Sequence, residues 1–236
     1  MGRNVSASGV SRWPIRATAV AFAGILFALV ASAVPAASSD GCGQVVTADL
    51  VLAHDLVCSS SGLLIRANGV TVNLNDHSII GPGPVLSSTG ISVGAFTSIE
   101  IIGPGTIRNF RTGIALAGSS DVLITGVTIR DNGWAMQPGS SAGIRIVGSH
   151  GVAIEGNVIK GNQDAGIDIV ASTGVAIAGN NIKKNAAGIY FVDTASTGNT
   201  VIGNKISEND IGIRGSIVGN TITGNRFKRN GMDFAP

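Results

Sequence analysis

Residues 143–185 contain the same sequence motif twice, and this repeat restricts the possible folds of the chain more than any other feature. The first copy reads GIRIVGSHGVAIEGNVIKGN and the second reads GIDIVASTGVAIAGNNIKKN. Each copy has a Gly-Ile-x-Ile run, a short turn, a Val-Ala-Ile run, a Gly-Asn pair and an Ile-Lys run. Three short apolar runs, separated by turns too short for a helix, predict the three strands of one triangular coil in a parallel β-solenoid.

The same phrase recurs along most of the chain. The glycine that opens each first strand recurs in steps of 22–24 residues, with two longer steps of 28 and 30, at Gly62, Gly90, Gly113, Gly143, Gly166, Gly188 and Gly212. This spacing indicates uniform coils with loops inserted at corners. Third strands are expected at Ile79, Ile107, Ile129, Ile159, Ile182, Ile206 and Ile222. The last interval is short, which predicts a truncated final coil. We expect about seven coils over residues 62–225 and a C-terminal tail at 226–236.

Equivalent side chains of stacked coils should line up in ladders. The inward positions predict an aliphatic stack of Ile114, Ile144, Ile167, Ile189 and Ile213. The Gly-Asn corners predict a file of stacked amides at Asn157, Asn180, Asn204 and Asn220. Stacked amides can hydrogen-bond to each other and to the turn backbone, so we interpret this file as architecture.

The first 33 residues have the organisation of an export signal. Three arginines precede an apolar run at residues 17–30, and Ala31-Ser32-Ala33 offers a small-x-small cleavage site. We predict a signal peptide over residues 1–33 and a location outside the cytoplasm, either secreted or in the periplasm or cell envelope. The alternative is a retained membrane anchor, because the run lacks charge. After cleavage we expect no membrane association.

Removing residues 1–33 changes the charge of the chain. Lysine plus arginine falls from 16 to 13 while aspartate plus glutamate stays at 14, so the net charge of the remaining chain is −1. Without a global positive field, we expect no nucleic-acid partner.

The two cysteines, Cys42 and Cys58, lie at the start of the mature region. In an exported protein they predict one disulfide that contributes about 2–3 kcal/mol by restricting the unfolded chain. A solenoid needs a cap over the strand edges of its first coil. We therefore predict a disulfide-linked N-terminal cap over residues 34–61.

The phrase GVTVNLNDHSIIGPG at residues 69–83, followed by the GI-x-I and GN-x-I-x-x-N repeats, resembles the right-handed parallel β-helix repeat proteins. That superfamily includes carbohydrate-binding and sugar-hydrolase domains, pectate-lyase-like enzymes, mannuronan epimerases and the periplasmic β-helix protein of copper maturation. The resemblance covers residues 62–225 and implies an all-β, single-stranded, right-handed parallel β-helix. It is specific for the fold and weak for the function, because the repeated residues are those that build the coil.

The third residue of each GI-x-I run should point outward from its strand. In successive coils from the N-terminus, this position holds Leu64, Ser92, Ala115, Arg145, Asp168, Tyr190 and Arg214. A lyase or uronate epimerase needs a cation for the carboxylate, a base for the C5 proton and an acid. Arg145, Asp168 and Tyr190 are the candidate catalytic residues, and Arg214 is a candidate substrate-binding residue. The competing interpretation is a solvated sheet face with a weak Arg145–Asp168 ion pair.

Two neighbouring features also suggest substrate binding. The inserted loop before Arg145 carries Trp134, a possible platform for a sugar ring or a lid over the coil. The residue after each third-strand isoleucine gives a row of cations at Arg108, Arg130, Lys160 and Lys183. Lys160 and Lys183 are candidate contacts for a polyanion such as a uronate polymer. Nearby acids can instead neutralise the row, and exposed lysines also discourage aggregation.

The resemblance to β-helix repeat proteins assigns few catalytic residues and no metal ligands to this chain. The epimerase motif resembles Tyr-Gly-x-Asp-Pro-His, and here only Gly166-Ile167-Asp168 matches its Gly-x-Asp part, with Ala165 in place of the tyrosine. We predict no metal site and no cofactor. Calcium is a weak option at Asp168 with Asp164 and Asp193. Three scattered histidines do not make a copper site.

Three functions follow from these patterns. The first is an exported β-helix that interacts with carbohydrate, with an acidic polysaccharide as the candidate class and lyase or epimerase activity left open. The second is a non-catalytic surface or scaffold β-helix that binds a protein or glycan partner. Accessory copper delivery is the third and is disfavoured by the ligand count.

Overall fold

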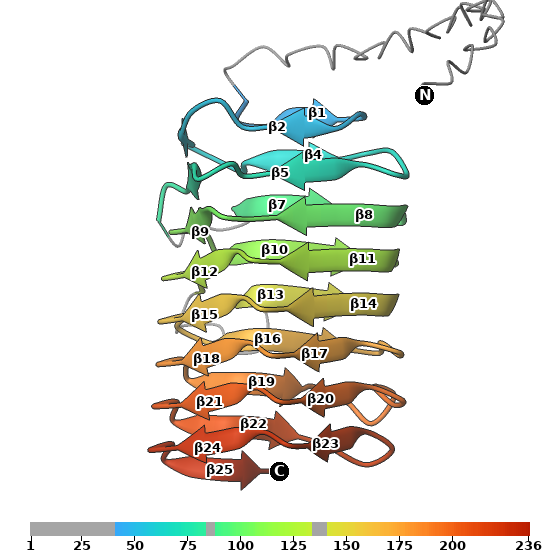
Figure 1. The fold of residues 1–236 in the computed structure, drawn as a ribbon, viewed down its shortest axis with the longest axis vertical. Coiled ribbons are helices and arrows are strands. Elements are labelled where there is room, and N and C mark those ends of the chain that lie inside the picture. Colours follow the sequence, from blue (N-terminus) through green and yellow to red (C-terminus); the bar gives the residue numbers. More distant parts are fainter. Residues whose placement is uncertain (1–40, 84–87, 134–140) are drawn as a thin grey trace, which may run out of the picture. The chain divides into compact units, whose positions relative to one another are not determined.

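The chain forms a parallel β-helix, as the repeat predicts, and it is of the right-handed type that the family resemblance implies (Figure 1). The computed structural model describes residues 41–83, 88–133 and 141–236. These residues belong to one compact unit, residues 34–236, and their regular elements are strands. Within the described ranges, no helix is long and apolar enough to cross a membrane.

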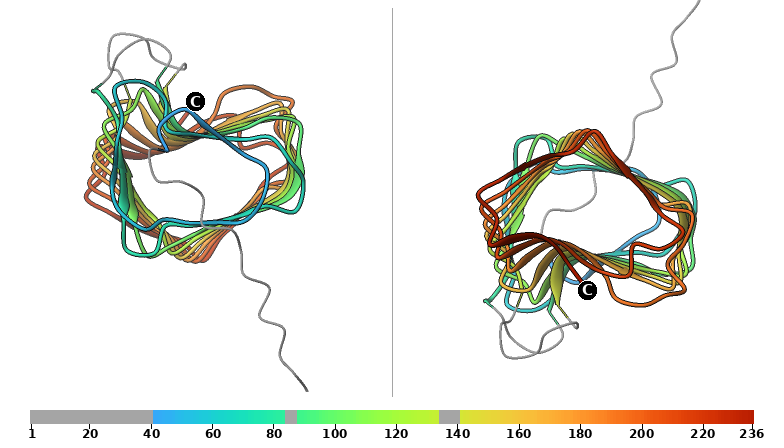
Figure 2. Two further views of the ribbon diagram at one scale, coloured as in Figure 1. Left: turned by 90° about the horizontal axis from the view of Figure 1, so that it is seen from above. Right: turned by 90° about the horizontal axis from the view of Figure 1, so that it is seen from below.

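Three parallel sheets form the sides of the solenoid, which Figure 2 shows along its axis. Sheet A contains β1 (Gln44–Val46), β4 (Leu63–Ile65), β7 (Thr89–Val93), β10 (Thr112–Ala117), β13 (Ala142–Val147), β16 (Ala165–Val170), β19 (Ala187–Phe191), β22 (Ile211–Gly215) and β25 (Met232–Ala235). Sheet B contains β2 (Leu50–Val51), β5 (Thr71–Asn73), β8 (Thr97–Ile102), β11 (Ser120–Thr125), β14 (His150–Glu155), β17 (Ala176–Ala178), β20 (Thr200–Ile202) and β23 (Thr221–Thr223). Sheet C contains β3 (Leu56–Val57), β6 (Ser78–Ile80), β9 (Thr106–Arg108), β12 (Thr128–Arg130), β15 (Val158–Lys160), β18 (Asn181–Lys183), β21 (Lys205–Ser207) and β24 (Arg226–Lys228).

The segment expected to cap the solenoid is its first coil. Strands β1, β2 and β3 pair in parallel with β4, β5 and β6, so residues 44–57 continue all three sheets. The predicted disulfide between Cys42 and Cys58 is confirmed, and it closes a loop with a sequence separation of 16. The disulfide therefore joins the two ends of the first coil. With this coil included, the described residues form about eight coils.

The end of the chain also differs from the sequence prediction. Ile222 lies in sheet B opposite Val201, and the third-strand position of that coil belongs to Phe227, which pairs with Ile206. The final coil is thus not truncated, and the segment 226–236 that was expected to be a tail holds β24 and β25. The prediction failed because an aromatic residue fills the place where earlier coils have isoleucine.

The core is a stack of aliphatic side chains from successive coils. The predicted ladder of Ile114, Ile144, Ile167, Ile189 and Ile213 is confirmed, and each of these side chains is at most 1% exposed. The glycine that opens each sheet A strand has a steric role. A Cβ on Gly166 would lie 2.7 Å from the carbonyl oxygen of Gly188 in the next coil. Only glycine permits that approach without a shift of the backbone.

Asparagines at one corner hydrogen-bond from coil to coil, but the ladder differs from the predicted one at its end. Asn157, Asn180 and Asn204 are followed by Asn225. Asn220, which was expected in this file, instead accepts a hydrogen bond from the backbone N–H of Asn199 at another corner. Two Gly-Asn pairs occur close together in the last coil, at 219–220 and 224–225, and the sequence phrase alone did not separate them.

A second asparagine ladder runs along the corner between sheets C and A. It comprises Asn132, Asn162, Asn185, Asn209 and Asn230. From Asn162 onward, each side-chain oxygen accepts a hydrogen bond from the preceding asparagine, whereas Oδ1 of Asn132 accepts from the backbone N–H of Phe110. Each Nδ2 of the first four asparagines also donates to a carbonyl group of an earlier coil. The ladders satisfy buried polar groups at the turns, where the sheets supply no partners.

The substitution Asn180→Ala tests the contribution of a ladder residue. Asn180 accepts hydrogen bonds from the backbone N–H and the Nδ2 of Asn157, and it donates to the carbonyl oxygen of Ile154 and to Oδ1 of Asn204. We expect a loss of about 3 kcal/mol in the free energy of unfolding, because the donors left behind are buried. Urea denaturation followed by circular dichroism measures the loss.

The adjacent Asn181 provides the control for this experiment, because its buried Oδ1 has no hydrogen-bond partner among the described residues. Asn181→Ala should change the free energy of unfolding by less than about 1 kcal/mol. Equal losses in the two variants would show that the ladder contributes nothing specific.

Candidate functional site

Four polar side chains occupy equivalent positions on four consecutive strands of sheet A. Arg145 of β13 pairs with Asp168 of β16, Asp168 with Tyr190 of β19, and Tyr190 with Arg214 of β22. The earlier positions of the same file are Leu64, Ser92 and Ala115, in the register expected from the repeat. Adjacent residues are separated by one strand spacing of about 4.8 Å. We call Arg145, Asp168, Tyr190 and Arg214 the site file.

Asp168 is completely buried, with 0% of its surface exposed. The expectation of a solvated face is therefore wrong at this residue. Beside it on the same face lies a small apolar cluster, separate from the core, in which Ala142, Ala165 and Ala187 pack together and against Tyr190. The buried Asp168 therefore lies near apolar side chains, while Arg145, Tyr190 and Arg214 of the site file are partly exposed.

Arg145 and Asp168 form an ion pair across the two strands. The Nη1 atom of Arg145 donates to Oδ2 of Asp168 at 2.7 Å, and the arginine side chain is 24% exposed. The second oxygen of Asp168, Oδ1, is buried and has no hydrogen-bond partner among the described residues. A buried acceptor without a partner is costly, and such atoms are uncommon in folded proteins.

Burial raises the pKa of Asp168 to about 7. The neighbouring Asp164 also raises it, whereas Arg145 and Arg214 lower it. The desolvation of the carboxylate therefore outweighs the attraction of both arginines. A carboxyl with a pKa near 7 exists in both protonation states at neutral pH, which is the property needed in a group that takes up and releases protons.

Tyr190 and Arg214 complete the site file. The guanidinium carbon of Arg214 lies 4.7 Å from the centroid of the Tyr190 ring, within the range of a cation–π interaction. Tyr190 is only partly exposed, because its ring also packs on the alanine cluster. Arg214 is thereby positioned above the ring and close enough to Asp168 to affect the pKa of its carboxyl.

The other predicted substrate-binding residues lie outside the site file. Lys160 and Lys183 lie on β15 and β18 of sheet C, where they pair with each other. They continue a row that begins with Arg108 and Arg130, and we call these four residues the basic row. The basic row belongs to a different side of the coil from the site file. Trp134, the proposed sugar platform, lies outside the described residues.

Acidic residues neutralise only part of the charge near the basic row. Arg130 is ion-paired with Asp131, and Lys184 and Arg229 both pair with Glu208 at the adjoining corner. A hydrogen bond from Arg229 lowers the pKa of Glu208. Lys160 and Lys183 have no ion pair among the described residues. Two unit charges one strand apart repel by about 1 kcal/mol even at the dielectric constant of water.

The donor groups of the described residues do not fit a metal centre. No group of three histidine, cysteine or acidic side chains converges among them. Cys42 and Cys58 are bonded to each other, and His77 lies near Asp55 with 3.5 Å between Nδ1 and Oδ1. Copper favours clustered thiolate, thioether or imidazole ligands, which this set does not bring together. For calcium, Asp168 is already paired with Arg145, and Asp193 accepts hydrogen bonds within its own turn.

Two properties of the site were not foreseen from the sequence. The alternation pattern predicted the order of the site file but not the burial of Asp168. Asp164 was considered only as a calcium ligand, although it is 7% exposed and acts on the pKa of Asp168. The phrase DAGID, which places two acids four residues apart at the start of a strand, is the sequence signal for that coupling.

The raised pKa of Asp168 predicts a pH dependence of stability. The carboxyl binds a proton more tightly in the folded protein than in the unfolded chain, so its contribution is complete below pH 4 and is lost as the pH rises through 7. Relative to Asp168→Asn, the wild-type free energy of unfolding should fall by about 4 kcal/mol between pH 4 and pH 8. Urea titrations of both proteins at each pH measure this difference. Parallel pH profiles would contradict it.

Comparisons with known proteins agree with this architecture. The A-module of mannuronan C-5 epimerase AlgE6 from Azotobacter vinelandii is 20% identical, with a TM-score of 0.58 over 81% of this chain and 59% of that chain. The periplasmic alginate epimerase AlgG is 17% identical, with a TM-score of 0.54 over 78% of this chain and 46% of that chain. This chain thus spans about half of each structure, and likeness at these identities shows the fold alone.

The family comparison covers more of the chain. The comparison with curated proteins gives no match. Residues 44–235, which extend from the first strand to the last, match the family described as periplasmic copper-binding protein (NosD). Because this match includes nearly the whole solenoid, the chain belongs to the NosD family of β-helix proteins.

Proposed function

We propose that the protein is an exported β-helix that recognises an acidic polysaccharide on the outer face of sheet A and performs lyase- or epimerase-type proton transfer there. The observation that carries the proposal is Asp168, a buried carboxyl with a pKa of about 7 and one oxygen that has no hydrogen-bond partner within the described ranges. Epimerases of alginate share the fold, which makes such a substrate reasonable but assigns no activity to this chain.

The site file has the groups that elimination from a uronate requires. The proton at C5 is acidified by the adjacent carboxylate, whose charge Arg145 and Arg214 are positioned to offset. Ionised Asp168 would take this proton through Oδ1, and the electron pair would form the C4–C5 double bond as the C4–O bond breaks. Tyr190 would donate its hydroxyl proton to the departing oxygen. In an epimerase, the C4–O bond would stay intact and Tyr190 would donate its hydroxyl proton to C5 from the opposite face of the sugar.

The burial of Asp168 sets a condition on this chemistry. A substrate reaches Oδ1 only if the atoms that bury the carboxyl move aside. The same burial favours the alternative function, a non-catalytic scaffold whose Arg145–Asp168 pair joins adjacent coils while the surface binds a glycan or protein partner. Catalytic turnover separates the two functions. Copper delivery is not proposed, because the donor set does not support it.

The cellular location of the protein is also proposed. The Cys42–Cys58 disulfide indicates folding in an oxidising compartment. The predicted signal peptide at residues 1–33 lies outside the described residues. We propose export to the periplasm or cell envelope, in agreement with the description of the family.

Turnover of defined polymers tests the proposed activity. We expect the mature protein to act on polymannuronate or polygalacturonate but not on a neutral glucan. Ultraviolet absorbance of the unsaturated product detects a lyase, and NMR detection of deuterium incorporated at C5 from heavy water detects an epimerase. Asp168→Asn should lower turnover by about 10²–10⁴-fold while binding is retained.

Ser92→Ala is the matched control for the Asp168 substitution, because Ser92 holds the same file position two coils before Arg145. Its turnover should equal that of the wild type. Full activity in Asp168→Asn would contradict the catalytic role. Binding of the polymers without any turnover would establish the scaffold function instead.

A further inference from the structure

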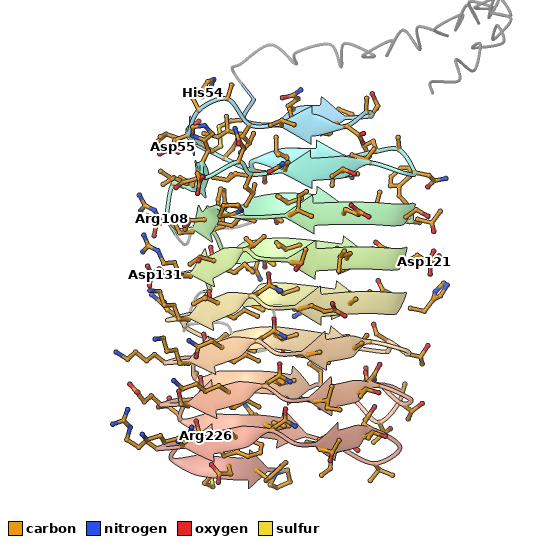
Figure 3. All side chains as sticks on the ribbon, in the orientation of Figure 1. His54, Asp55, Arg108, Asp121, Asp131 and Arg226 are labelled. Atoms are coloured by element: carbon orange, nitrogen blue, oxygen red, sulfur yellow. A yellow bond between two sulfur atoms is a disulfide. The ribbon has the colours of Figure 1, made fainter. Side chains whose placement is uncertain are left out.

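Charge is segregated among the sides of the solenoid. The strands of sheet C carry seven of the chain's 16 lysines and arginines and no acidic residue, and these are Arg108, Arg130, Lys160, Lys183, Lys205, Arg226 and Lys228. The described strands of sheet B have the opposite charge, because they carry three acidic residues and no lysine or arginine. Figure 3 shows Arg108 at one edge of the ribbon, next to Asp131 of the adjoining corner, and Asp121 of sheet B at the other edge.

The basic side chains are ordered by the strand register. Residues of the basic row pair directly with one another on β9, β12, β15 and β18, so their Cα atoms repeat once per coil along the solenoid axis. The repeat is therefore about 4.8 Å, and it continues over four coils. All four side chains are partly exposed, whereas Lys205, Arg226 and Lys228 in the coils beyond are exposed.

A shallow depression lies along this row. It has a volume of about 300 Å³ and is lined by Arg130, Asp131, Lys160, Gly161, Lys183 and Lys184. Of its charged lining groups, Asp131 is bound to Arg130, and Lys184 contacts Glu208. Lys160 and Lys183 thus leave net positive charge at the centre of a concave surface. Such a surface attracts and concentrates anions.

We propose that the outer face of sheet C is a second binding surface, distinct from the site file, which holds a linear carboxylated polysaccharide parallel to the solenoid axis. A polymer with one carboxylate on each sugar presents charges in a line, which matches cations repeated at a constant interval. This choice of ligand rests on the proposed function. The surface anchors the polymer, and the site file on sheet A acts on it.

Equilibrium binding at several salt concentrations tests the proposal. The probe is polymannuronate, with dextran as the neutral polymer, and the protein is the full mature chain. We expect polymannuronate binding to weaken as salt rises and dextran binding to be absent. Lys160→Gln with Lys183→Gln should weaken polymannuronate binding about fivefold and reduce its salt dependence. Lys160→Arg with Lys183→Arg should retain wild-type binding.

A matched control separates local from global charge. Ala153→Glu with Thr223→Glu changes the net charge by the same two units on sheet B, where both residues pair with uncharged neighbours. This variant should bind like the wild type. Equal weakening by the glutamine and glutamate variants would overturn the proposal. Binding through the two lysines to DNA or phosphatidylglycerol vesicles but not to polymannuronate would overturn the choice of ligand.

The result does not depend on catalysis. If wild-type protein binds the polymer through Lys160 and Lys183 but never turns it over, the catalytic proposal fails and this inference stands. If turnover occurs and the glutamine variant binds normally, the reverse holds.

Discussion

The stacking of each coil on the next is the interaction on which the rest of the structure depends. Parallel strand pairs join the coils on three sides, and the asparagine ladders join them at the corners. Because both kinds of contact link equivalent residues, every coil reproduces the register of the one before it. A side chain on the surface therefore has a neighbour about 4.8 Å above and below it, fixed by the repeat.

This constraint gives the departures from the repeat their chemical properties. Arg145, Asp168 and Tyr190 are far apart in the sequence, but the strand register pairs them directly with one another on three consecutive strands. The carboxyl of Asp168 is buried there, and this burial raises its pKa to about 7 despite the adjacent arginine. The same register in sheet C places the four residues of the basic row in one line. One architectural rule thus produces two surfaces with different electrostatics.

The sequence predicted the fold, the disulfide and the register of the site file, because these follow from periodic spacing. It did not predict which residues end the solenoid. Phe227 replaces the isoleucine of earlier coils, and the first coil has no GI-x-I phrase, so both ends lack the pattern on which the prediction relied. The burial of Asp168 depends on packing between neighbouring strands, which alternation does not describe. The strand order did predict that Lys160 and Lys183 lie on a different strand of the coil from the site file, and the structure confirms it.

The most direct test of the account is a carbon-13 NMR titration of the Asp168 carboxyl in the mature protein. Its signal can be assigned by comparison with Asp168→Asn. If burial on the face of sheet A controls this group, the titration midpoint should lie at about 7. A midpoint near 4, the ordinary value for an aspartate, would show that the carboxyl is solvated and would remove the basis for its role in proton transfer.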